Sequence, residues 1–109
     1  MIHTEVKFGE VHNLASQVES GAENVHFKSI FNNDNGGVSL VAFKAGQKLD
    51  THTAPAQVMI NVLEGEIEFT MLGNPHIIRA GEFMLMGEEV PHSVLAKTDS
   101  KLMLIKVKP

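Results

Sequence analysis

Short hydrophobic runs separated by glycine-containing turns make up most of this chain. The runs are rich in Val, Ile, Leu, Phe and Met, and a turn signal follows roughly every eight residues. Seven to nine short strands at this spacing are typical of a β-sandwich or barrel rather than of alternating strands and helices. The sequence therefore predicts an all-β antiparallel domain. The expected strands are 25–31, 38–46, 57–73 (two strands joined at Glu64-Gly65), 76–81, 82–87, 92–96 and 101–107.

Only one short stretch has helical spacing of its apolar residues. In residues 13–19, Asn13 is suited to cap a helix, and Leu14 and Val18 lie one turn apart. The sequence thus predicts a single domain in two parts. An N-terminal segment, residues 1–24, carries the short helix, and residues 25–109 form the barrel.

Composition and charge exclude several classes of function. The net charge is −4 at pH 7, and the chain has one arginine and no basic run, which argues against nucleic-acid binding. The absence of cysteine excludes disulfides, thiolate catalysis and Cys-ligated metal sites. No apolar stretch is long enough to span a membrane, and no secretory leader is predicted. We therefore expect a cytoplasmic protein with no membrane partner.

Two segments place a histidine close to a proline after a glycine turn. Residues 46–65 contain His52, and residues 81–92 contain His92. In the first segment, five residues separate Gly46 from His52. In the second segment, five residues separate Gly81 from Gly87. In these spacings the sequence resembles the cupin family of small β-barrels, most closely over residues 38–96. The resemblance implies a single antiparallel cupin barrel, or jelly roll.

The same segments depart from the family pattern at the metal ligands. The family's His-x-His reads His52-Thr53-Ala54 here, and Gln57 stands at the glutamate position. Gly87-Glu88-Glu89 replaces Pro-x-Gly in the second motif. The resemblance therefore implies a degenerate site made of His52, His92 and Gln57. We expect it to hold no metal, or to hold Zn, Ni, Mn or Fe weakly, because the amide is a neutral and weak donor.

The alternation of side chains along strands extends the predicted site. If Gln57 faces the barrel interior, Met59 and Asn61 share that face. The expected ligand pocket then consists of His52, Gln57, Met59, Asn61 and His92. A few polar groups among apolar side chains are typical of small-molecule sites.

Three functions are compatible with these residues. The first is a small-molecule-binding barrel of unspecified activity with a degenerate metal site. The second is a metal-dependent enzyme, an oxygenase or isomerase acting on a small polar substrate. The third is a dimeric sensory or scaffolding module. A homodimer is expected from the resemblance, and pairing of exposed strand edges would also stabilise so small a barrel.

Overall fold

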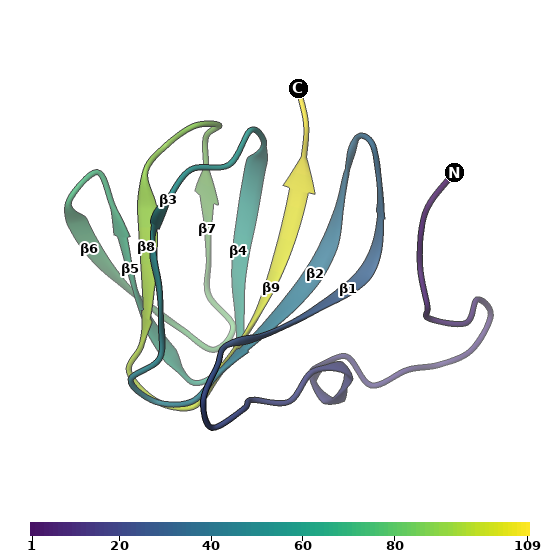
Figure 1. The fold of residues 1–109 in the computed structure, drawn as a ribbon, viewed down its shortest axis with the longest axis horizontal. Helices are drawn as coiled ribbons and strands as arrows, with labels where there is room; N and C mark the ends of the chain where they lie inside the picture. The colour runs from purple at the N-terminus through teal and green to yellow at the C-terminus, as the bar shows by residue number, and fades with distance from the viewer.

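Nine β-strands follow an N-terminal segment in the computed structural model, which describes residues 1–109 (Figure 1). The all-β prediction is confirmed. The expected helix at 13–19 is shorter, a single 3-10 turn in which Asn13 Oδ1 accepts a hydrogen bond from the backbone N–H of Ser16. The elements are η1 (Ala15–Gln17), β1 (His26–Asn33), β2 (Gly36–Phe43), β3 (Lys48–His52), β4 (Gln57–Glu64), β5 (Glu66–Met71), β6 (Asn74–Arg79), β7 (Phe83–Met86), β8 (His92–Ala96) and β9 (Ser100–Val107).

The strands form two antiparallel sheets that face each other. One has five strands in the order β1-β2-β9-β4-β7, and the other has four in the order β3-β8-β5-β6. Figure 1 shows the four-stranded sheet at the left, with β1 and β2 opening away at the right. The chain crosses between the sheets repeatedly, as in a jelly roll. Strand β3, which carries His52, was not among the expected strands.

The core lies between the sheets and is built by alternation along the strands. In β4, Val58, Ile60 and Val62 are buried and face the other sheet, where Ile67 and Phe69 of β5 meet them. One strand face is buried because its apolar residues recur at every second position. This phase decides which β4 side chains line the barrel interior.

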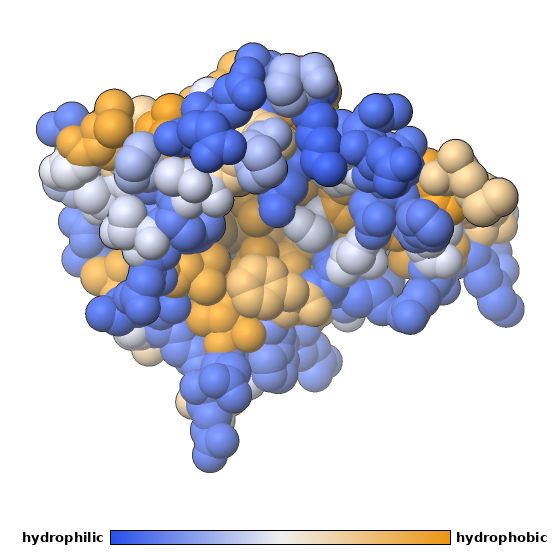
Figure 2. All heavy atoms as spheres, turned by 45° about the horizontal axis from the view of Figure 1, so that its top comes forward, coloured by the Kyte–Doolittle hydropathy of each residue, from blue (hydrophilic) through white to orange (hydrophobic).

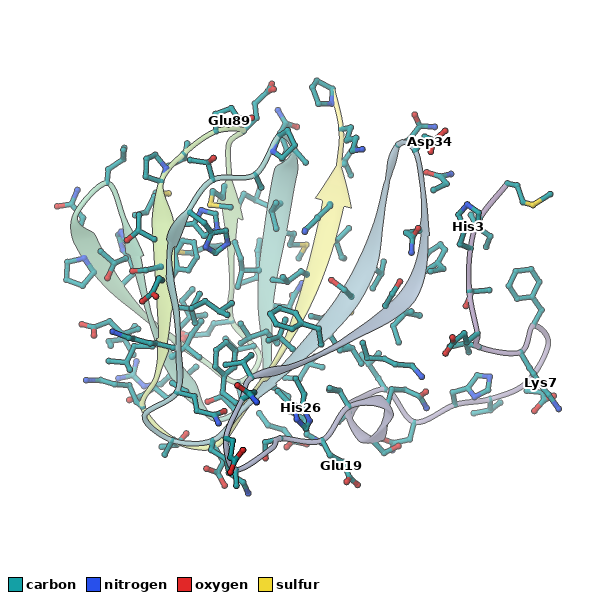
Figure 3. The ribbon with its side chains drawn as sticks, in the orientation of Figure 1. His3, Lys7, Glu19, His26, Asp34 and Glu89 are labelled. Carbon is teal, nitrogen blue, oxygen red and sulfur yellow. The ribbon has the colours of Figure 1, made fainter.

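The N-terminal segment covers part of the outer face of the five-stranded sheet. Val18 packs there against Leu40 and Ala42 of β2. Further towards the N-terminus, His3 forms a single β-bridge with Asn32 of β1. His3 and Lys7 mark the stretch that stands at the edge of the molecule in Figure 3. No helix in the structure has the length and apolar character needed to cross a membrane.

Candidate functional site

His52 and His92 lie side by side between strands β3 and β8. They are register partners across the two strands, and their ring centroids are 4.2 Å apart with the planes inclined at 60°. His92 is 6% exposed, whereas His52 is exposed. The ring of Phe69 stacks on His92 at a centroid distance of 5.6 Å. The structure therefore brings together the two imidazoles that the sequence predicted to converge.

Each imidazole is oriented by a local hydrogen bond. Nδ1 of His52 lies 2.8 Å from the carbonyl oxygen of Asp50, and Nδ1 of His92 lies 2.9 Å from that of Val90. A carbonyl oxygen only accepts, so Nδ1 carries the hydrogen in both rings. In the neutral tautomer, Nε2 of each ring then keeps its lone pair. The pair thus offers two acceptor nitrogens that no protein group occupies.

Burial favours the neutral form of His92. Desolvation lowers its pKa from the ordinary value of 6.5, and the positive charges of His52 and Lys106 act in the same direction. The hydrogen bond to Val90 opposes this, since it raises the pKa. The net pKa shift is downward, so His92 is uncharged at neutral pH.

A cavity of about 200 Å³ lies beside the two histidines, between the sheets. Its walls are mostly apolar and come from both sheets, with Val41 and Leu104 on one side and Leu49 on the other. Lys106 supplies its one formally charged side chain. Figure 2 shows an apolar patch in the middle of the molecule, surrounded by hydrophilic side chains. A small apolar chamber with a few polar groups is suited to a small ligand.

Two connections meet near the mouth of this cavity. Ala54 in the β3–β4 connection lines the cavity, and its carbonyl oxygen accepts a hydrogen bond from the backbone N–H of Glu89 at 2.8 Å. Glu89 lies at the tip of the β7–β8 connection, where its side chain points away from the sheets (Figure 3). The bond holds the two connections together beside the histidines.

Three of the predicted pocket residues lie elsewhere. Gln57 is exposed, and Met59 and Asn61 are on the face of β4 that points away from the cavity. The sequence motif predicts Gln57 on the inward face of β4, but the structure places Val58 and Ile60 on that face. The predicted alternation of β4 is therefore shifted by one residue. The family motif includes residues 53–56, which form the loop between β3 and β4, and side chains do not alternate between two faces in a loop. The amide of Gln57 therefore does not join the two imidazoles in one donor set.

Sequence reasoning also missed a cavity residue that has a readable signal. Lys106 shares the inward face of β9 with Leu102 and Leu104, each two residues apart. That alternation is visible in the sequence Lys-Leu-Met-Leu-Ile-Lys-Val, residues 101–107. A lysine at the end of an apolar strand face is normally read as a solvent-exposed charge, so Lys106 was not assigned to the cavity.

The donor set does not fit a tightly held transition metal. Such sites draw three or four ligands from His, Cys, Asp and Glu. No group of three such side chains lies together anywhere in the structure. His52 and His92 alone supply two imidazole nitrogens.

The comparisons with known proteins agree with this architecture. The family model described as Cupin domain matches residues 39–108. A search of curated proteins finds no match. An RmlC-like cupin from Desulfovibrio desulfuricans is 29% identical, with a TM-score of 0.80 over 90% of this chain and 95% of that one. A cupin 2 conserved barrel domain protein from Leptotrichia buccalis is 34% identical, with a TM-score of 0.84 over 89% of this chain and 47% of that one.

The fold is also shared with a more distant protein. A conserved protein of unknown function from Streptococcus pyogenes is 21% identical, with a TM-score of 0.88 over 95% of this chain and 91% of that one. The likeness at this identity concerns the fold alone.

Proposed function

The chain belongs to the cupin family, and from that premise we propose that it binds a small molecule in the cavity beside His52 and His92. The single observation that carries the proposal is the state of the two rings. Each uses Nδ1 to hold a backbone carbonyl, and each keeps Nε2 free in a chamber with mostly apolar walls. A hydroxyl or amide hydrogen of a ligand would satisfy one of these acceptors, and a ligand with two such hydrogens would satisfy both.

Burial of His92 supports this proposal. Polar groups in an apolar environment cost free energy unless they are hydrogen-bonded. His92 is 6% exposed, and its one protein hydrogen bond goes through Nδ1. An apolar residue of similar volume would fill the same space without this cost. We therefore interpret the retained imidazole as serving a ligand.

The second candidate is a metal-dependent enzyme of the oxygenase or isomerase class. The two free Nε2 atoms favour it, since imidazole nitrogen is a common protein ligand for transition metals such as Zn, Ni and Fe. In that case water or substrate atoms would complete a loosely held ion, because the protein provides only two such donors. Metal content of protein purified without chelators separates this candidate from a metal-independent binding barrel.

Imidazole NMR signals test the proposed binding site directly. We expect small polar ligands that raise the melting temperature to shift the ring signals of His52 and His92. His76, which is exposed on β6, serves as an internal control and should not shift. The variant His52→Ala should weaken binding and His76→Ala should not. Ligands that stabilise the protein but leave both site signals unchanged would contradict the proposal.

A further inference from the structure

The charge distribution around the cavity differs from that of the whole chain. The protein has 13 acidic residues against nine basic ones. No Asp or Glu lines the cavity beside the histidines, and its one formally charged side chain is Lys106. Because the cavity is lined by a lysine and by no carboxylate, its electrostatic potential favours an anion although the protein as a whole is acidic.

A second hollow of about 380 Å³ adjoins the first and continues the same pattern. The two share Ala54, Pro55 and Lys106 in their linings. The second hollow adds Lys108, together with serine and asparagine side chains, and again includes no carboxylate. Lys106 therefore stands between an apolar chamber and a polar, cationic one.

The amine of Lys106 has no carboxylate partner within the protein. The structure contains three ion pairs, and none of them involves Lys106; they are Lys44–Asp99, Lys48–Asp50 and Arg79–Glu66. The acidic side chains of Asp34 and Glu89, at two loop tips, point away from the sheets in Figure 3. The positive charge at the cavity is therefore left for a group from outside.

The position of Lys106 is fixed by its strand. Its backbone pairs with Gly37 of β2 on one side and with Val58 of β4 on the other, within the five-stranded sheet. The backbone of a residue inside a sheet is held more precisely than that of a residue on a loop, so the Cα position of Lys106 is well defined. Lys106 can therefore act as an anchor for a ligand rather than only as a solvated charge.

We infer that the cavity takes a small organic carboxylate, with its anionic end at Lys106 and its hydrocarbon part against the apolar walls. This inference rests on the proposed function. A hydroxyl on the ligand would donate to Nε2 of His52 or His92, so hydroxycarboxylates are the best-matched class. Charge-assisted hydrogen bonds from an ammonium group supply the selectivity for the anion.

Matched probes that differ only in charge test the inference. Binding of 3-hydroxybutyrate and of 3-hydroxybutanamide is measured by calorimetry, with the ring signals of His52 and His92 reporting the location. We expect the carboxylate to bind roughly tenfold more tightly than the amide, or more. Inorganic phosphate has charge but no hydrocarbon part, and it should bind more weakly than the carboxylate.

Two lysine variants complete the experiment. Lys106→Gln should reduce the preference for the carboxylate to about twofold or less, while Lys97→Gln, which removes the same charge from a distant turn, should preserve it. Thermal melts establish that both variants are folded.

Equal affinity of the two probes for the wild-type protein, or a preference that survives in Lys106→Gln, would overturn the anion inference and leave the binding function intact. Tighter binding of phosphate than of the carboxylate would assign the lysines to an inorganic anion and would also overturn it. If neither organic probe bound or moved the histidine signals, the anion inference would fail, while the proposed function would still be decided by the ligands that raise the melting temperature.

Discussion

His52 and His92 face each other across β3 and β8 with the same tautomer, because each donates Nδ1–H to the carbonyl two residues before it. The repeated hydrogen bond orients both rings by local backbone geometry. It requires no distant partner, so the pair is preorganised before a ligand arrives. The stability of the site should therefore depend on pH, and its metal affinity should depend on further ligand side chains placed beside the two rings.

The first prediction concerns the pH dependence of stability. Burial lowers the pKa of His92 in the folded protein from 6.5. Below pH 6.5 the unfolded chain therefore binds a proton at His92 that the folded chain does not. The free energy of unfolding should fall as the pH drops below about 6.5, until the folded-state pKa is reached.

Denaturant unfolding at several pH values between 7.5 and 5 measures this effect. His92→Gln cannot titrate and should show a smaller loss of stability over that range. His76→Gln removes an exposed histidine and should follow the wild-type curve. Identical pH profiles for the wild type and His92→Gln would show that His92 is not responsible.

The second prediction concerns metal affinity. Ala54 lines the same cavity as the two histidines, whereas Gln57 is exposed at the start of β4. Ala54→His would add a third imidazole and should raise the affinity for Zn or Ni by about tenfold or more. Gln57→Glu adds a negative charge outside the cavity and should change the affinity little. Titration calorimetry measures both, and a large gain from Gln57→Glu alone would contradict the geometry of the site.

The contrast between these two positions shows how far the sequence could be interpreted. The resemblance to the cupin family, carried by the spacing of the glycines and of His52 and His92, correctly implied a jelly roll with two converging imidazoles. The all-β class itself followed from turn signals and short apolar runs, which a single sequence displays. Motif spacing alone did not fix the phase of β4. That phase is set by the packing of Val58 and Ile60 on the opposite sheet.

Two other features depended on contacts that the sequence does not display. The short strand β3 has a single apolar residue, Leu49, and it forms because β8 pairs with it at the edge of a sheet. The alternation of Lys106 with Leu102 and Leu104 is visible in the sequence, but the cavity that this face of β9 lines follows from the position of β9 between β2 and β4. Both are consequences of strand order, which single-sequence patterns do not encode.

The third prediction concerns the expected homodimer, and we propose the outer face of the five-stranded sheet as its surface. One apolar residue from each strand forms a row across this face, and no member of the row is charged. Two copies of an acidic chain approach most easily where both surfaces are uncharged, so a second copy matches this face. The row consists of Phe31, Val38, Ile105, Met59 and Leu85.

Light scattering with matched variants tests this proposal. The wild type should have a mass near twice 11.9 kDa at micromolar concentration, unchanged by about 0.5 M salt. Leu85 is 69% exposed in the row and Leu72 is 67% exposed on a turn of the other sheet. Leu85→Glu should therefore yield monomers, and Leu72→Glu should remain dimeric. A monomeric wild type would refute the dimer, and a dimeric Leu85→Glu would refute this surface.

The last prediction separates backbone strain from close packing at two glycines. Gly65 and Gly81 have nearly the same positive φ, 82° and 87°, in a region that alanine adopts at a cost of about 1–2 kcal/mol. A Cβ at Gly81 would meet nothing within 4 Å, but a Cβ at Gly65 would overlap the carbonyl oxygen of Asp99. Gly81→Ala should therefore lose only the conformational cost. Gly65→Ala should lose about 1–3 kcal/mol more, because the β4–β5 turn and the start of β9 must move apart. Urea unfolding of both variants measures the difference. Equal losses would mean that the turn at Gly65 relaxes freely and that its contact with Asp99 does not constrain the two sheets.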